Sequence, residues 1–124
     1  MNDNAKKIQD AELEVMQALW KAEGPVPLID IRRQLSAKCG WEDSTVKTLL
    51  RRLCAKGAVK LERRGVYRAV VTEQEYSQWS TKNFLSKVFE GSAKKLVASL
   101  LSSGELSEAD LAELFAMFNR EEHK

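Results

Sequence analysis

The stretch WEDSTVKTLLRRLCAKG, from Trp41 to Gly57, decides the fold of this chain. Its apolar residues recur at three- and four-residue spacing: Val46, Leu49, Leu50 and Leu53. This spacing predicts an amphipathic helix with one apolar side. The opposite side is polar and carries Ser44, Thr45, Lys47, Thr48, Arg51 and Arg52. We expect Asp43 or Ser44 to cap the first turn, and Gly57 to end the helix in a left-handed conformation.

Two interpretations fit such a helix. The major groove of DNA would suit it, because Arg and Lys donate to guanine O6 and N7 while Thr offers a hydroxyl and a methyl group. A basic amphipathic helix is equally typical of an ordinary solvated protein surface. The neighbouring segments therefore have to decide between these two interpretations.

Two helices are predicted before this stretch. The first is expected to be capped by Asp10 and to end at Gly24, with apolar positions at Leu13, Met16, Leu19 and Trp20. Residues 25–27 hold two prolines and should form an extended connector. The second helix is predicted over 28–38, and a turn at 39–41 joins it to the central helix. The pair then forms a helix-turn-helix.

A hairpin is predicted after the central helix. The segment AVKLERRGVYRAVV, residues 58–71, alternates apolar and polar residues on both sides of Gly65, which favours two strands joined by a tight turn. Three helices followed by a basic hairpin describe a winged helix. We expect the wing to bring Arg63, Arg64 and Arg68 close to a phosphate backbone. The predicted fold class is mainly α, a winged helix-turn-helix with a two-stranded β-wing over 1–72.

Residues 73–124 are predicted to be a separate helical region. Helices are expected over 73–90, from about 93 to 101, and after a capping box formed by Ser107 and Asp110. Three short helices carry more apolar side chains than they could bury alone. We expect them to form a homodimer, although folding back onto the winged helix is an alternative. The predicted dimerisation residues are Leu85, Val88, Phe89, Leu96, Val97, Leu100, Leu111, Leu114, Phe115 and Phe118.

The charge is unevenly distributed along the chain. The net charge is +2, but residues 38–68 hold nine Lys and Arg against three Asp and Glu, a balance of +6, and the remainder carries −4. This asymmetry favours a polyanion as the partner of the central region. A winged helix that binds another protein instead of DNA is the alternative function, and it gives no reason for such a concentration of charge.

Enzymatic activity is not expected. Cys39 and Cys54 lack the spacing of a metal site, and His123 has no second catalytic group near it. Nucleophile–base pairs, phosphate loops and zinc signatures are missing from the sequence, so we expect no cofactor and no metal. No apolar run reaches 18 residues, and the N-terminus does not read as a signal peptide. We therefore expect a cytoplasmic protein that does not insert into membranes.

Four segments carry a resemblance to a known family: DAELEVMQALW at 10–20, GWEDSTVKTLLRRLCAKG at 40–57, RRGVYR at 63–68 and FLSKVFEGSAKKLVASLL at 84–101. On these segments the chain resembles the penicillinase-repressor (BlaI/MecI/CopY) family of bacterial transcription factors. The resemblance implies a homodimeric repressor bound to an inverted repeat of TACA/TGTA type. It implies DNA contacts from the polar side of the helix (Ser44, Thr45, Lys47, Thr48, Arg51 and Arg52) and from the wing (Arg63, Arg64, and Tyr67 or Arg68).

The chain departs from the family where the inducing signal acts. The copper-responsive branch ends in repeated Cys-x-Cys pairs, whereas this chain has no cysteine after Cys54, which excludes copper sensing through that site. In the β-lactam-responsive branch a membrane sensor protease triggers cleavage of an Asn-Phe bond. The aligned bond here is Ser99–Leu100, and Asn83–Phe84 lies 16 residues earlier. Release by proteolysis, by a ligand or by a redox change all stay open.

Overall fold

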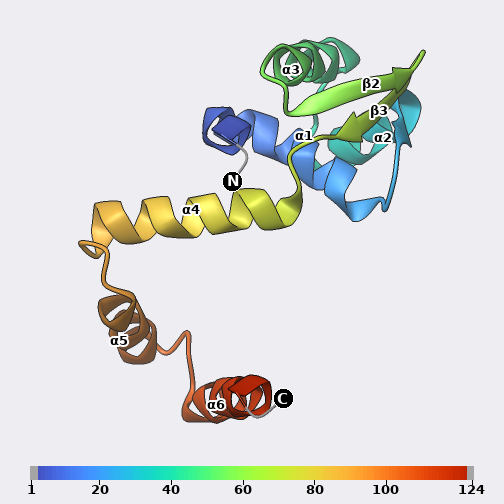
Figure 1. The fold of residues 1–124 in the computed structure, drawn as a ribbon. Helices are drawn as coiled ribbons and strands as arrows, with labels where there is room; N and C mark the ends of the chain where they lie inside the picture. The colour runs from blue at the N-terminus through green and yellow to red at the C-terminus, as the bar shows by residue number, and fades with distance from the viewer. Residues whose placement is uncertain (1–2, 123–124) are drawn as a thin grey trace. The chain divides into compact units, whose positions relative to one another are not determined.

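The computed structural model describes residues 3–122 and divides into two compact units, one ending at Ser80 and one beginning at Thr81. Figure 1 shows the order of the elements along the chain. They are η1 (Asp3–Lys7), α1 (Asp10–Lys21), β1 (Val26–Pro27), α2 (Leu28–Cys39), α3 (Asp43–Ala55), β2 (Val59–Arg63), β3 (Val66–Ala69), α4 (Glu73–Val88), α5 (Ala93–Ser103) and α6 (Glu108–Glu122). The predicted mainly α winged-helix fold is confirmed.

The core of the first unit lies between α1, α2, α3 and the sheet. The predicted apolar side of α3 is confirmed, because all four of its residues are buried: Val46, Leu49, Leu50 and Leu53. Met16 and Leu19 of α1 and Ile31 and Leu35 of α2 are buried in the same cluster. The polar side of α3 is consequently the side that remains outside the core.

The sheet has three antiparallel strands in the order β1-β3-β2. The predicted hairpin is formed by β2 and β3, with Gly65 at a φ of 72° in its turn. The segment predicted as a connector adds β1, in which Val26 pairs with Tyr67 and Pro27 with Val66. A proline can occupy such a strand because β1 is an edge strand and needs no donor on its outer side.

Two predicted helix caps are wrong by one residue. The residue that precedes α1 is Gln9, and its backbone N–H donates to the carboxylate of Glu12 at 3.0 Å. Asp10 therefore lies in the first turn of α1. Glu42 precedes α3, so Asp43 is also inside the helix. Its negative charge interacts favourably there with the positive end of the helix dipole. The predicted left-handed end at Gly57 is confirmed by a φ of 78°.

The first turns of α4 belong to the first compact unit. Thr72 and Glu75 form a reciprocal capping box, with bonds of 2.9 Å from the Thr72 N–H and 3.1 Å to the Thr72 hydroxyl. Tyr76 packs against Trp20 with ring centroids 5.8 Å apart, and Trp79 packs on Tyr76 at the same distance. The indole N–H of Trp20 also donates to the carbonyl of Val71 at 2.9 Å. The division predicted at 72/73 coincides with the start of α4, and it stays a prediction.

The second unit has well-defined helix ends. The Ser92 hydroxyl accepts from the N–H of Lys95 at the start of α5. The predicted capping box of α6 is confirmed, since Ser107 and Asp110 exchange two bonds of 3.1 Å. Between residues 81 and 120, none of the side chains is fully buried. Among the helices of residues 3–122, none is both long and apolar enough for a membrane span.

Candidate nucleic-acid interface

The outer side of α3 presents most of the polar residues that the sequence predicts there. The exposed ones are Ser44, Thr45, Lys47, Arg51 and Arg52. Thr48 is half-buried, and its hydroxyl donates to the carbonyl of Ser44 at 2.9 Å. Its oxygen keeps acceptor capacity, because a hydroxyl has two lone pairs. The helix is thus fixed by its buried side while charged and hydroxyl groups point outward.

The wing carries the second group of predicted contact residues. Arg63 and Arg64 are exposed at the end of the hairpin, next to the turn at Gly65. Tyr67 and Arg68 are half-buried. The guanidinium of Arg68 is held by the carboxylate of Glu62 at 2.9 Å, which neutralises much of its charge.

A hollow of about 360 Å³ brings three of the predicted contact residues together. It is lined by Lys47 and Arg51 of α3, by Tyr67 of the wing, and by Leu28, Cys54 and Leu61. Leu61 is an apolar position of the predicted hairpin, but it is 50% exposed and lines this hollow instead of the core. Burial raises the pKa of the Cys54 thiol, which keeps it protonated and a weak nucleophile at neutral pH.

Ion pairs compensate the charge of three of the nine cations in segment 38–68. Lys38 pairs with Glu14 at 2.8 Å, Lys56 with Glu12 at 2.5 Å, and Arg68 with Glu62. The hydrogen bond to Glu14 also raises the pKa of Lys38. Within residues 3–122, the other six cations of segment 38–68 form no ion pair: Lys47, Arg51, Arg52, Lys60, Arg63 and Arg64. The uncompensated positive charge of this segment is therefore confined to α3 and the hairpin.

The predicted dimerisation residues all keep some exposure to solvent. Five are exposed: Val88, Val97, Leu114, Phe115 and Phe118. Five are half-buried: Leu85, Phe89, Leu96, Leu100 and Leu111. Three further apolar residues of these helices are also exposed but are not in the predicted dimerisation set: Phe84, Leu101 and Met117. Phe84 and Leu101 lie at apolar positions of the helices predicted from the sequence, whereas Met117 was not singled out.

Three comparisons with known proteins agree with one another. The chain is 32% identical to the penicillinase repressor of Bacillus licheniformis over 95% of this chain and 92% of that protein. It is 27% identical to the methicillin resistance regulatory protein MecI of Staphylococcus aureus (strain N315), over 97% of this chain and 99% of that protein. The solution structure of the DNA binding domain of the repressor BlaI superposes with a TM-score of 0.53 at 34% identity, covering 61% of this chain and 94% of that one.

A family profile also matches nearly the full length of the chain. Residues 8–120 match the family described as penicillinase repressor, which confirms the resemblance predicted from the sequence. Members of this family are transcriptional repressors with a winged-helix DNA-binding domain, and they are not enzymes. The chain belongs to the penicillinase repressor family.

Proposed function

We propose that the chain is a cytoplasmic, homodimeric transcriptional repressor that binds a palindromic operator of TACA/TGTA type. The observation that carries this proposal is the confinement of the six unpaired cations to α3 and the hairpin. Phosphate backbones attract such a surface, and an exposed helix with a buried opposite side fits the major groove. Two similar proteins, the penicillinase repressor of Bacillus licheniformis and the DNA binding domain of the repressor BlaI, support the same conclusion.

Helix α3 and the hairpin have different roles in this proposal. Lys47 and Arg51 lie on the outer side of α3, from which bidentate or single donors reach guanine O6 and N7. Ser44, Thr45, Thr48 and Arg52 provide the remaining contacts to base edges or nearby phosphates. Arg63 and Arg64 lie at the hairpin end and bind phosphates, which adds affinity without sequence discrimination. Tyr67 and Arg68 contribute less, because both are half-buried.

The second unit is the dimerisation region in this proposal. Its exposed apolar side chains include Phe115 and Phe118, which are 61% and 59% exposed. A second copy of the chain would cover them and place two α3 helices on successive turns of DNA. A two-fold dimer of this kind reads an inverted repeat.

A membrane sensor protease as a further partner stays a prediction. The bond aligned with the family cleavage site, Ser99–Leu100, lies inside α5, and Asn83–Phe84 lies inside α4. Release by proteolysis therefore requires local opening of a helix at either position, since a protease binds its substrate in an extended form.

Binding to duplex DNA tests the proposed function. An inverted TACA/TGTA duplex and a scrambled duplex of equal length are titrated at several salt concentrations by fluorescence anisotropy. We expect a steep salt dependence, with a slope of roughly −7 to −9 in log K against log salt, if each subunit neutralises four or five phosphates. Lys47→Ala should lose discrimination by about 1–3 kcal/mol, the value of one base contact. Arg64→Ala should weaken both duplexes about equally.

Lys21→Ala is the matched control, because Lys21 is an exposed lysine outside α3 and the hairpin. It should leave both affinities unchanged. Equal affinity of the unaltered protein for the two duplexes would overturn the operator proposal. Indistinguishable effects of Lys47→Ala and Arg64→Ala would overturn the division of roles between helix and wing.

A further inference from the structure

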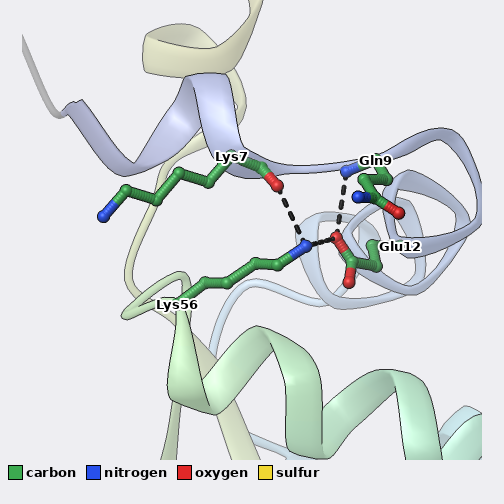
Figure 2. Close-up of polar contacts among 4 residues, drawn as sticks. All are labelled: Lys7, Gln9, Glu12 and Lys56. Atoms are coloured by element: carbon green, nitrogen blue, oxygen red, sulfur yellow. Dashed lines mark hydrogen bonds and ion pairs between the residues drawn. The ribbon is translucent and has the colours of Figure 1, made fainter.

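A buried ion pair holds the C-terminal end of α3 to α1 and to the N-terminal segment. Figure 2 shows the ammonium group of Lys56 between the Glu12 carboxylate, at 2.5 Å, and the backbone carbonyl of Lys7, at 3.0 Å. The same carboxylate oxygen accepts from the N–H of Gln9 at 3.0 Å. Glu12 is 1% exposed, and the side chain of Lys56 is 24% exposed.

A second contact ties the same helix end to the N-terminal segment. The side-chain amide of Asn4 donates to the carbonyl of Gly57 at 3.4 Å. The approach is close enough that a Cβ at position 57 would lie 2.7 Å from the Asn4 amide nitrogen. Ala5 and Ile8 anchor this segment in the core. The end of α3, and with it the start of the hairpin, is therefore held from one side by polar contacts of fixed direction.

Stability alone does not explain why this place is charged. Removing two charges from water costs free energy, and replacing a buried ion pair by apolar residues of similar volume is often neutral or stabilising. The second carboxylate oxygen of Glu12 is buried and has no hydrogen-bond partner among the described residues, which adds to that cost. What the pair does provide is a defined distance and direction between α1 and the end of α3.

We propose that Glu12 and Lys56 are positioning residues that set the placement of α3 for operator discrimination, and that Lys56 does not itself contact DNA. This inference rests on the proposed function. Lys56 follows Arg52 by one helical turn, so a shift at its end moves the outer side of the whole helix. Base-edge contacts require a placement within about 0.5 Å. Contacts to phosphates act over a longer range and tolerate such a shift.

The test replaces the pair by apolar residues in the full chain. The double variant Glu12→Met/Lys56→Met keeps the volume and removes the directional contacts. We expect thermal unfolding close to that of the unaltered protein. Its ratio of affinities for the TACA/TGTA duplex over the scrambled duplex should fall about tenfold, the loss of one base contact. Its affinity for the scrambled duplex, and the salt slope on that duplex, should stay within error, because Lys56 neutralises no phosphate.

The matched control is Glu14→Met/Lys38→Met, which removes the 2.8 Å ion pair between α1 and α2. This variant should keep the full affinity ratio. If the first double variant does not fold, Lys56→Gln decides instead. A glutamine is too short to reach both partners, but its side-chain amide can still donate a hydrogen bond to the Glu12 carboxylate. It should show the same loss of discrimination.

The proposal is overturned if the folded variants discriminate as the unaltered protein does, or if both duplexes lose affinity equally. A salt slope reduced by about one would show that Lys56 contacts a phosphate. If the unaltered protein does not discriminate between the duplexes, the operator proposal itself has failed. These outcomes are distinguishable in a single set of titrations.

Discussion

The two units of this chain use the same local signals but differ in what covers their apolar side chains. In the first unit, Leu53 is 0% exposed and lies in a core shared by three helices and a sheet. In the second, Phe115 is 61% exposed. From Thr72 to Arg120, no residue is fully buried. Val71 is therefore the last buried residue before Arg120.

The difference shows that helix ends and helix burial have separate causes. Thr72 with Glu75 and Ser107 with Asp110 form the same capping box, one at the edge of a core and one without a core. Caps satisfy backbone groups locally, whereas burial of an apolar side requires a second surface. Apolar surfaces of this kind on a chain typically mark a contact with another protein.

The largest effect is expected from a chain that ends at Ser80. It keeps Tyr76 and Trp79 on the core, so it should fold, and it should be monomeric in sedimentation. Its affinity for the TACA/TGTA duplex should fall by a factor on the order of 100 or more, because the second half-site no longer binds at a high effective concentration. A stable dimer of residues 1–80, or a monomeric full-length chain, would refute the assignment of the second unit to dimerisation.

A smaller effect is expected when one apolar side chain is truncated in each unit. Leu53→Ala should lower the free energy of unfolding of the first unit by about 2–5 kcal/mol, because it leaves a cavity in a packed core. Phe118→Ala should instead weaken self-association by about 1.5–3 kcal/mol per subunit, the value of one buried large side chain. Urea unfolding, followed at two protein concentrations, distinguishes the two effects. A concentration-independent loss with Phe118→Ala would place that residue in a core of its own subunit.

The sequence predicts well those features that depend on near neighbours along the chain. The apolar side of α3 follows from residues three and four apart, and the α6 capping box from Ser107 and Asp110. The hairpin follows from alternation around Gly65. Each of these signals lies within one short stretch of the chain, and the apolar side of α3, the capping box and the hairpin are all confirmed by the structure.

Features that depend on distant residues could not be predicted in this way. Lys56 was counted with the basic surface, but its partner Glu12 is 44 positions away in the sequence. The pairing of β1 with β3 joins Val26 to Tyr67, which no local pattern reveals. The missed cap at Gln9 has a different cause, which is local: the Glu12 carboxylate accepts the Gln9 N–H three residues away, and this favours the residue before Asp10. The proposed DNA contacts and the proposed dimer contacts involve partner molecules, and no pattern within one chain specifies such contacts.

The smallest effect is expected from removing the capping hydroxyl at the start of α4 or of α6. Thr72→Ala removes the hydroxyl that accepts from the Glu75 N–H at 3.1 Å, and Ser107→Ala removes the equivalent bond to the Asp110 N–H. Thr72→Ala should lower the free energy of unfolding of the first unit by about 1 kcal/mol, a typical cost of losing a cap. Ser107→Ala should leave that value unchanged, because α6 lies outside the first unit, and should reduce helicity measured by circular dichroism instead. If both variants lowered the stability of the first unit equally, the two units would unfold together, and the contrast between them would not extend to their stability.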